Sequence, residues 1–342
     1  MYGGLIYGQI KLYTHFNMKL GFWKKIKKPI LVMAPMLDVT DAVFRQVVCK
    51  CGKPDVMFTE FVSVDGLTHK KSKGKLMHRY LRFSEKERPI VAQIWGTDPE
   101  KFYESAKIIS KLGFDGIDIN MGCPDKKVVK AGAGAGLILN PILAQKIIQA
   151  TKKGAGKIPV SVKTRIGYDK NIIKKWITRL LEVEPAAIII HGRTKKEMSK
   201  VPARWDAIGE AVKIAEKYKK KHKSKTLILG NGDISELKDA YEKMKTYKVD
   251  GVMIGRAVLS NPWFFNKSKN FTTISLKEKL GLLKFHVQLF NKFYGKTRNI
   301  NMVKKYIKGY ISGFKGSKEV RADLMPAKTL PILLDKINRF MV

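Results

Sequence analysis

A single cysteine stands where a side chain could do chemistry, in the segment Gly113–Pro141. This segment, GFDGIDINMGCPDKKVVKAGAGAGLILNP, contains a short apolar run that is typical of a buried strand and ends in the polar residue Asn120. Cys123 follows within three positions, between Gly122 and Pro124. A cysteine that only filled the core would more often lie on the apolar face of an element, so we interpret this thiol as a candidate reactive group.

The glycine-rich stretch after the cysteine allows two interpretations. Gly132 and Gly134 resemble part of a dinucleotide-binding fingerprint, but they follow a loop rather than a strand, which argues against a Rossmann fold. We instead expect a close-packed loop beside Cys123. The lysines of the segment either face whatever approaches this loop or are ordinary solvated charges: Lys126, Lys127 and Lys130.

The rest of the chain supplies the elements that would position such a site. Short β-branched apolar runs predict eight strands: Ile30–Ala34, Asp55–Thr59, Ile90–Ile94, Gly116–Asn120, Pro159–Lys163, Ala187–Ile190, Thr226–Leu229 and Gly251–Ile254. Amphipathic stretches between them predict helices, among them Asp41–Cys51, Pro99–Leu112, Pro141–Lys153, Ile172–Glu182, Trp205–Lys219 and Ser235–Lys245. Parallel strands buried on both faces read as apolar runs without alternation, as these do. The pattern predicts an α/β fold, a (β/α)8 TIM barrel.

Polar residues follow nearly every predicted strand, at the end where barrel enzymes build their active sites. Each alone has an ordinary explanation, since a lone histidine is usually a satisfied core or surface residue and a lone lysine is usually solvated. Together they would lie on one rim. In chain order they are Pro35–Met36, Glu60, Gln93, Asn120 with Cys123, Lys163 with Arg165, His191 with Arg193, Asn231–Gly232–Asp233 and Gly255–Arg256.

The last two strand ends indicate a phosphate site. The loop Asn231–Ser235 supplies backbone N–H groups, with its serine as a plausible helix N-cap, and Gly255–Arg256 adds close backbone approach and a guanidinium group. From the opposite side, Lys163 could place a cation against a ring that becomes electron-rich on reduction, while Gln93 and His191 could hydrogen-bond to its edge. A phosphate site and contacts of this kind to a reducible ring are what the binding of flavin mononucleotide (FMN) requires.

After Trp263 the chain carries helical runs and no predicted strand. The runs are Leu276–Phe293, Met302–Phe314 and Lys328–Phe340, with breaks at glycines and at Pro326. We therefore expect an N-terminal extension (1–27), the barrel (28–268) and a small C-terminal helical domain (275–342). Lysines and tyrosines of the second run form either a phosphate-tracking face or plain solvated surface with aromatic packing: Lys304, Lys305, Lys308, Tyr306 and Tyr310.

The 342-residue chain is strongly basic, with 67 Lys and Arg against 29 Asp and Glu and a formal net charge of +38. This excess suits a polyanionic partner such as RNA, although runs such as Lys219–Lys225 are often only solvated helix ends. The sequence has no run of eighteen apolar residues and no signal-like N-terminus, which predicts a cytoplasmic protein without a membrane segment. Met18 is an alternative start.

The cysteines do not form a disulfide or zinc-binding pattern. Of the three, Cys49 and Cys51 are only two positions apart, and the sequence has no partnering Cys or His pair at metal-ligand spacing. We expect a monomer that holds no metal.

Seven motifs of this sequence resemble the tRNA-dihydrouridine synthases, nearest to their bacterial B-type branch. INMGCP is the most specific part, whereas GNGDI and IGRA recur in other flavin barrels. The motifs span the whole predicted barrel in the order of the family: MAPMLDVTDAVFR (Met33–Arg45), VAQIWG (Val91–Gly96), the cysteine segment, VSVKTRIG (Val160–Gly167), IIIHGRT (Ile188–Thr194), GNGDI (Gly230–Ile234) and GVMIGRAVLSNPWFF (Gly251–Phe265).

The resemblance implies reduction of uridine in tRNA to 5,6-dihydrouridine by FMN, which NADPH or NADH recharges. It implies that Cys123 donates a proton and that Asn120 and Arg165 contact the target uracil. The implied flavin contacts are Pro35, Met36, Leu37, Gln93, Lys163, His191, Asn231, Gly232, Asp233, Gly255 and Arg256. The sequence departs from the family at Leu37–Asp38, where relatives often have Ala-Gly, and its C-terminal helices match only faintly.

Two other functions stay open. The chain could be another flavin barrel, such as a dihydroorotate-dehydrogenase-like protein that acts on a free pyrimidine, which the basic charge and the helical appendage disfavour. It could also be an RNA-binding protein or RNA chaperone whose barrel has lost catalysis. The complete set of Cys123, Lys163, His191 and Arg256 argues against that second alternative.

Overall fold

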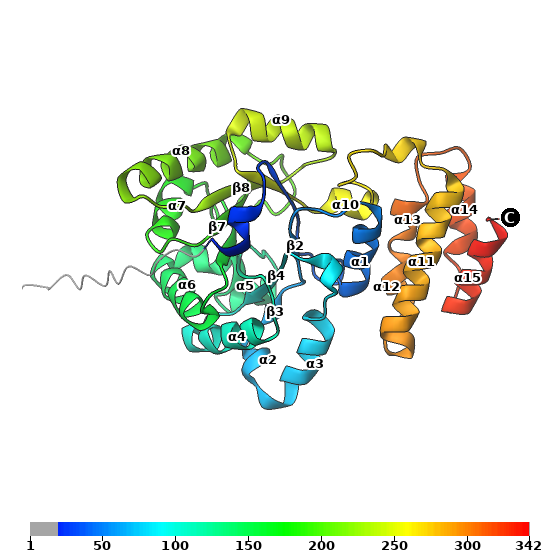
Figure 1. Ribbon diagram of the computed structural model, residues 1–342, viewed down its shortest axis with the longest axis horizontal. Helices are drawn as coiled ribbons and strands as arrows, with labels where there is room; N and C mark the ends of the chain where they lie inside the picture. Colours follow the sequence, from blue (N-terminus) through cyan, green and yellow to red (C-terminus); the bar gives the residue numbers. More distant parts are fainter. Residues whose placement is uncertain (1–19, 342) are drawn as a thin grey trace, which may run out of the picture.

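Parallel strands form a barrel in the computed structural model, which describes residues 20–341 (Figure 1). The strand order is β1-β9-β8-β7-β6-β5-β4-β2, with β3 paired to β4. A bridge between Val32 of β1 and Val56, the residue before β2, joins the two ends of this order. The eight predicted strands and the predicted barrel are confirmed. The strands are β1 (Ile30–Met33), β2 (Met57–Phe58), β3 (Val62–Ser63), β4 (Ile90–Trp95), β5 (Gly116–Met121), β6 (Val160–Arg165), β7 (Ala187–His191), β8 (Leu227–Asn231) and β9 (Gly251–Ile254).

Helices cover the outside of the barrel because each presents an apolar stripe at helical spacing. In α7 the buried residues include Ile173, Trp176, Ile177 and Leu180, which lie on one face. Several helices begin at a capping side chain, as α1 does at Asp41, whose carboxylate accepts from the N–H of Phe44. The outer helices are α1 (Ala42–Cys51), α4 (Pro99–Lys111), α6 (Pro141–Ala155), α7 (Ile173–Leu181), α8 (Trp205–His222), α9 (Leu237–Tyr247) and α10 (Arg256–Ser260).

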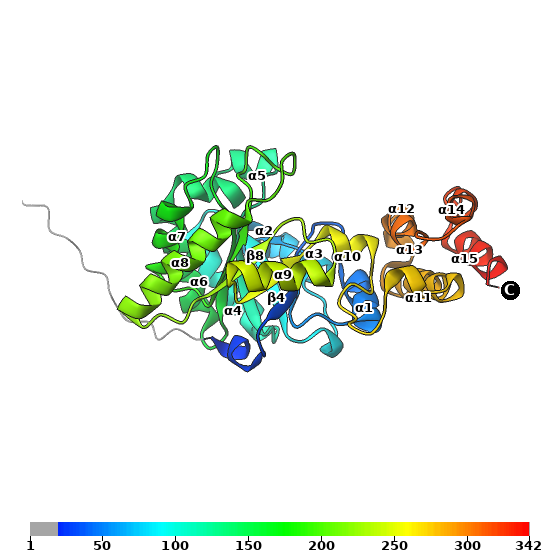
Figure 2. The ribbon, with the colours of Figure 1, turned by 90° about the horizontal axis from the view of Figure 1, so that it is seen from above.

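The barrel interior changes from apolar at its base to polar at its mouth. Alternate strand residues point inward, and at the base they are apolar, as Ile30 and Val32 are. Trp23 of the short helix η1 (Gly21–Lys25) and Leu20, the N-cap of this helix, pack against this inner core. Figure 2 shows η1, in dark blue, on the side of the barrel opposite α5 (Lys126–Lys130). The same alternation turns polar side chains inward near the mouth: Gln93, Asp118, Asn120, Ser161, Lys163, Arg165, His191 and Asn231.

The N-terminal boundary predicted at residue 28 stays a prediction, but packing begins before it. Leu20 and Trp23 already belong to the inner core. Met18, the alternative start, lies outside the described residues.

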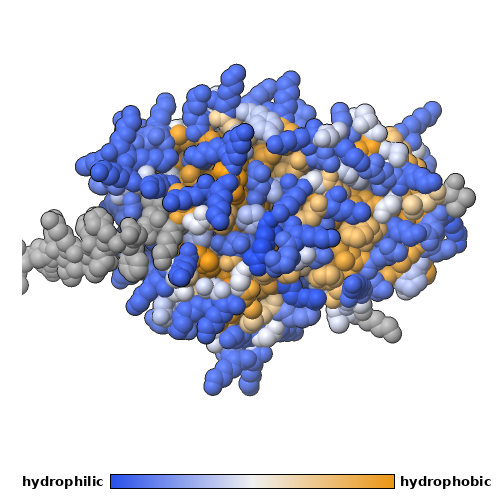
Figure 3. Space-filling model, viewed as in Figure 1, coloured by the Kyte–Doolittle hydropathy of each residue, from blue (hydrophilic) through white to orange (hydrophobic). Residues whose placement is uncertain are grey.

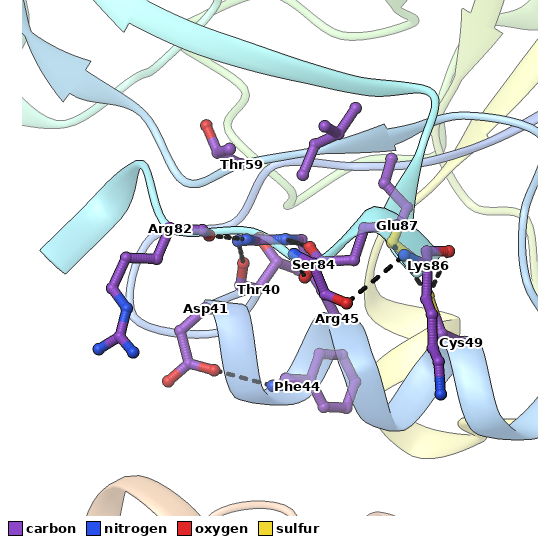
Figure 4. Close-up of polar contacts among 12 residues, drawn as sticks. Thr40, Asp41, Phe44, Arg45, Cys49, Thr59, Arg82, Ser84, Lys86 and Glu87 are labelled. Atoms are coloured by element: carbon purple, nitrogen blue, oxygen red, sulfur yellow. Dashed lines mark hydrogen bonds and ion pairs between the residues drawn. The ribbon is translucent and has the colours of Figure 1, made fainter. Parts of the chain in front are cut away.

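A buried ion pair ties α1 to the loop before β4 (Figure 4). Arg45 Nε lies 2.6 Å from Glu87 Oε2, and both side chains are inaccessible to solvent. The other two nitrogens of Arg45 donate to the carbonyl oxygens of Thr40 and Arg82 at 2.9 and 2.6 Å. Glu87 Oε1 accepts from the N–H of Ser84 at 2.8 Å. Every polar atom of the pair therefore has a partner, which is the condition for burying opposite charges.

The C-terminal helices pack beside α1 rather than around the barrel (Figure 1). They are α11 (Leu276–Tyr294), α12 (Asn301–Lys304), α13 (Ile307–Tyr310), α14 (Ser317–Leu324) and α15 (Leu330–Arg339). The single helical run predicted for Met302–Phe314 is wrong, because the chain turns between α12 and α13. At this turn Tyr306 stacks on Phe44 of α1, with 4.7 Å between ring centroids, and its hydroxyl donates to the carbonyl of Val39.

Of the two interpretations left open for these lysines and tyrosines, the structure supports aromatic packing for the tyrosines. Tyr306 and Tyr310 are buried, and the hydroxyl of Tyr310 lies 2.8 Å from Nδ1 of the buried His286. Lys304 donates to the carbonyl of Ala327, whereas Lys308 is exposed. The two tyrosines therefore belong to the packing between the helices and the barrel.

Two helices near the mouth were not predicted. α2 (Val64–Thr68) and α3 (Lys70–Tyr80) project from the barrel after β3, as the light-blue hairpin at the bottom of Figure 1. None of the residues of α3 is buried, so the sequence lacks the apolar stripe that would have indicated a helix.

Hydrophilic side chains cover most of the face shown in Figure 3, consistent with the net charge of +38. Within residues 20–341, no single helix is long and apolar enough to cross a membrane; one pair, Lys126–Leu139 with Pro141–Ala155, passes on length and composition but is bent by 95°. In the same part of the chain, no group of three or more His, Cys, Asp or Glu side chains could hold a metal ion.

Candidate active site

A cavity of about 910 Å³ opens at the C-terminal ends of the strands. It is lined by ten of the fourteen predicted site residues: Pro35, Met36, Lys163, Arg165, His191, Asn231, Gly232, Asp233, Gly255 and Arg256. The other four do not line it: Leu37, Gln93, Asn120 and Cys123. Its charged lining residues are one carboxylate, Asp233, and four cations, so the cavity carries excess positive charge; the cations are Lys163, Arg165, Arg193 and Arg256.

Lys163 lies deep in this cavity, where a hydrogen bond fixes its amine. Its Nζ lies 3.1 Å from Oδ1 of Asn231, whose Nδ2 donates to the carbonyl of Met253 at 2.7 Å. Because that carbonyl can only accept, the amide oxygen of Asn231 must face the lysine. Burial and the neighbouring Arg165 lower the pKa of Lys163 to about 8. The amine therefore still carries a proton at neutral pH, and an anionic ligand beside it would favour that charge.

Asp233 joins two arginines at the edge of the cavity. One carboxylate oxygen accepts from Arg193 and from the N–H of Ala203, and the other lies 3.0 Å from Arg256. Burial alone would raise the pKa of Asp233, but the hydrogen bonds from Arg193 and Ala203 and the charge of Arg256 lower it overall. The carboxylate thus holds both guanidinium groups at one end of the cavity. Ser235 is not the N-cap that the sequence predicted, since α9 begins after Glu236 and the N–H of Ser235 donates to Asp239.

His191 is a neutral hydrogen-bonding group. Its Nε2 lies 3.1 Å from Nη1 of Arg193, and because a guanidinium group can only donate, Nε2 must accept. The proton of the ring is then assigned to Nδ1. Burial, followed by the charge of Lys163 and three nearby arginines, lowers the pKa of His191 well below its ordinary value. His191 therefore adds no positive charge to the cavity wall.

Asn120 and Arg165 hold the loop that carries Cys123. Oδ1 of Asn120 accepts from the N–H groups of Gly122 and Cys123 at 3.1 and 2.9 Å. Arg165 donates from Nε to the carbonyl of Gly122 at 2.7 Å and from Nη1 to the carbonyls of Thr194 and Met198 in the loop after β7. A Cβ on Gly134, whose φ is +57°, would lie 2.9 Å from the carbonyl oxygen of Cys123. The close-packed loop predicted beside the cysteine is therefore confirmed.

The thiol of Cys123 is half-buried beside the cavity, and the next residue, Pro124, lines it. Burial, together with the charge of Asp125, raises the pKa of this thiol, while a backbone hydrogen bond from Asp125 and the charges of Arg165 and Lys163 act in the opposite direction. The group is therefore protonated at neutral pH. The structure thus brings an acid to the edge of a cationic cavity.

Gln93 and Glu60 lie away from the cavity surface. Gln93 is fully buried, and its Oε1 accepts from Asn120 at 2.9 Å. Glu60 accepts from the N–H of Asp38 at 2.6 Å, and burial, with the charge of Asp41, raises its pKa to about 7. The predicted flavin contact of Gln93 and the predicted uracil contacts of Asn120 and Arg165 stay predictions.

Comparison with protein families bears on this arrangement, because a family model described as dihydrouridine synthase (Dus) matches residues 32–337. The chain belongs to the dihydrouridine synthase family. The resemblance stated from the sequence motifs is confirmed, and the protein is an enzyme of an oxidoreductase family.

Relatives of this dihydrouridine synthase family member match over nearly their whole length. A probable tRNA-dihydrouridine synthase of Staphylococcus aureus is 44% identical over 329 residues, which cover 95% of this chain and 98% of the relative. A probable tRNA-dihydrouridine synthase 2 of Bacillus subtilis is 41% identical over 327 residues, which cover 94% of this chain and 98% of the relative. Among solved structures, histamine dehydrogenase from Rhizobium is similar with a TM-score of 0.54 at 11% identity, covering 76% of this chain and 48% of that one. This last likeness supports the barrel fold alone.

Some lining residues of this dihydrouridine synthase family member had no assigned contact in the sequence prediction. Arg193 was expected on the rim beside His191, but its contact with Asp233 in the cavity wall was not predicted. Phe271 and Ser312 reach the cavity from beyond the barrel strands. Lys279 connects them, since its amine donates to the carbonyl of Ser312 and lies 4.2 Å from the ring centroid of Phe271. The C-terminal helices therefore help to build the cavity, and no local sequence pattern indicates this.

Proposed function

We propose that this protein is a cytoplasmic FMN-dependent enzyme that reduces uridine in tRNA to 5,6-dihydrouridine, with NADPH or NADH as the electron donor. The observation that carries the proposal is a protonated, half-buried thiol beside a cavity with four cationic side chains and one carboxylate. Membership of the dihydrouridine synthase family and 41–44% identity to probable tRNA-dihydrouridine synthases support the choice of substrate.

The lining residues fit FMN. Arg193 and Arg256, which Asp233 holds together, would bind the phosphate, and Lys163 would lie against the electron-rich edge of the flavin ring. A Cβ on Gly232 would lie 2.7 Å from Ala203 and 3.1 Å from His191, so only glycine leaves room in this part of the wall. When bound, FMN supplies the hydride that uracil needs at C6.

Cys123 would supply the proton that the other carbon needs. Saturation of the C5–C6 double bond takes a hydride at C6 and a proton at C5, and a thiol kept protonated by burial can give that proton. Proton donation leaves a thiolate on Cys123. The nearby charges of Arg165 and Lys163 favour the thiolate and so lower the cost of this step.

The surface around the mouth suits RNA. A target base must leave its stack to enter the cavity, which costs a few kcal/mol, less in a loop than in a duplex. Phosphate contacts to basic side chains would offset this cost. Lys126, Lys127 and Lys130 of α5, close to Cys123 in the chain, are exposed for such contacts. We also propose that the C-terminal helices share in tRNA binding.

The proposal is tested with tRNA transcribed in vitro, which lacks dihydrouridine, incubated with the protein, FMN and NADPH or NADH. Mapping of dihydrouridine in the product is expected to show reduction at defined uridines. Activity on free pyrimidines but not on tRNA would establish the other flavin enzyme instead. A colourless protein that binds tRNA and reduces nothing would establish an RNA-binding barrel.

Replacement of Lys163 with methionine is expected to weaken FMN binding roughly thirtyfold, because one charge-assisted hydrogen bond contributes about 2 kcal/mol. Methionine removes the charge while keeping an unbranched side chain. The affinity is measured by titrating flavin-free protein with FMN and following flavin fluorescence. Lys146→Met, at an exposed position of α6, is the matched control. Equal FMN affinity in both variants would remove Lys163 from the flavin site.

Replacement of Lys126 and Lys127 together with alanine is expected to reduce the salt dependence of tRNA binding. The slope of log affinity against log salt concentration should become shallower by about 1.4–1.8, since each of the two phosphate contacts contributes about 0.7–0.9. The matched control is Lys220→Ala with Lys221→Ala, two exposed residues at the end of α8 that leads to the base of β8. Equal slopes for the two double variants would show that α5 does not contact the RNA.

A further inference from the structure

The carboxyl group of Asp118 lies inside the barrel, and both of its side-chain hydrogen-bond partners are neutral; the charge of Lys163 acts on it only from beyond ion-pair distance. The residue is fully buried in β5, and among residues 20–341 no lysine, arginine or histidine forms an ion pair with it. Its Oδ1 accepts from the hydroxyl of Ser161 at 2.6 Å, and its Oδ2 accepts from Nε2 of Gln93 at 2.7 Å. Burying a carboxyl group whose hydrogen-bond partners are neutral is costly, so the position needs an explanation.

The hydrogen bonds of Asp118 continue as a chain toward Cys123. Gln93 donates to Asp118 and accepts from Nδ2 of Asn120 at 2.9 Å, and Oδ1 of Asn120 accepts from the N–H groups of Gly122 and Cys123. All side chains of the chain are more than nine-tenths buried, so water does not compete for their hydrogen bonds.

The two ends of this chain fix the direction of every hydrogen bond in it. At one end, backbone N–H groups can only donate, so the amide oxygen of Asn120 must face them. Its amide nitrogen then faces Gln93, which must turn its oxygen to Asn120 and its nitrogen to the far end. That nitrogen requires an acceptor, and Asp118 provides it. An apolar residue at 118 would leave the nitrogen of Gln93 buried without a partner or allow the amide to turn over.

We propose that Asp118 is a positioning residue, which acts through Gln93 and Asn120 to fix the loop that presents Cys123. The role requires an acceptor at position 118 rather than a charge. In Asp118→Asn, the amide oxygen can still accept from Gln93 while the amide nitrogen donates to the hydroxyl of Ser161, which can rotate to accept. In Asp118→Leu, no acceptor remains.

The first test measures the alkylation rate of Cys123 by iodoacetamide, followed by mass spectrometry of the peptide that contains it, with Cys123→Ala as the blank. Asp118→Leu is expected to change this rate by about tenfold, the factor that corresponds to one buried hydrogen bond, and Asp118→Asn by less than about twofold. Equal rates in Asp118→Leu and wild type would overturn the proposal. Equal effects of the leucine and asparagine variants would also overturn it, because the charge of Asp118 would then be what matters.

A second comparison separates a hydrogen-bonded chain from a general loss of packing, and also serves if Asp118→Leu alone does not fold. Gln93→Leu breaks the middle of the chain, and Gln93→Leu with Asp118→Leu leaves no unpaired carboxyl group in the core. If Asp118 acts through Gln93, the double variant should alkylate at the rate of Gln93→Leu. A larger effect in the double variant would show that Asp118 acts by another route.

A kinetic measurement extends the test and rests on the proposed function. Asp118→Leu should lower kcat for uridine reduction while leaving the KM for tRNA unchanged, since the chain holds the acid and not the RNA. The alkylation rate does not depend on any reaction with tRNA. If Asp118→Leu alters the alkylation rate but the wild-type protein reduces no uridine, the proposed function is rejected. Asp118 would still be the residue that positions the loop.

Discussion

Replacement of Cys123 with alanine is expected to slow the reduction of uridine in tRNA by about 10²–10⁴-fold, the usual contribution of a positioned general acid. Reduction of the enzyme by NADPH should continue at the wild-type rate, because that step takes no proton from Cys123. Cys123→Ser should be nearly as slow as the alanine variant, since a serine hydroxyl is a far weaker acid than a thiol. The thiol is half-buried and protonated at neutral pH, which is the state this role requires.

The two half-reactions are followed separately by rapid mixing under anaerobic conditions. The flavin absorbance reports first the reaction of the oxidised enzyme with NADPH and then the reaction of the reduced enzyme with tRNA. Cys49→Ala is the control, because Cys49 is a half-buried cysteine that does not line the cavity. If Cys123→Ala reduces tRNA uridine at the wild-type rate, the cysteine is structural and another group donates the proton.

Replacement of Glu87 with glutamine is expected to lower the free energy of unfolding by about 3–5 kcal/mol, because it leaves the buried charge of Arg45 without its counter-ion. Glutamine keeps the shape of the side chain and its acceptor for the N–H of Ser84. Its amide nitrogen, however, would meet Nε of Arg45, which is also a donor. The loss is therefore one of charge and hydrogen bonding and not of volume.

The stability is measured by urea unfolding followed by circular dichroism. The matched control is Asp335→Asn, which breaks the exposed pair between Asp335 and Arg339 on α15 and should cost less than about 0.5 kcal/mol. Arg45→Met with Glu87→Leu should recover part of the loss, because no unpaired charge remains. Similar losses in Glu87→Gln and Asp335→Asn would show that the buried pair is not specially coupled.

The barrel could be predicted from the sequence because its strands are buried on both faces, which leaves uninterrupted apolar runs such as Ala187–Ile190 in β7. The break between α12 and α13 could not. It depends on the contact of Tyr306 with Val39 and Phe44, residues more than two hundred positions away, and no local pattern encodes such a contact.

The rim of the site could be predicted because inward-facing positions at strand ends follow from the period of two along each strand. What each side chain does there could not. Asn120 is the register partner of Lys163, yet only Lys163 lines the cavity. The amide oxygen of Asn120 instead accepts hydrogen bonds from backbone N–H groups of its own loop. The link between Arg193 and Asp233 depends in the same way on how two loops approach each other.

The base of the barrel has a consequence for the order of events during catalysis. Leu20 and Trp23 fill that end of the interior, so the cavity is reached from the strand ends at the mouth. Under the proposed function, the nicotinamide of the electron donor and the flipped uracil must then occupy the same space in turn. In each catalytic cycle the small electron donor and the large tRNA would then bind in strict alternation. The time that tRNA remains bound would set an upper limit on turnover.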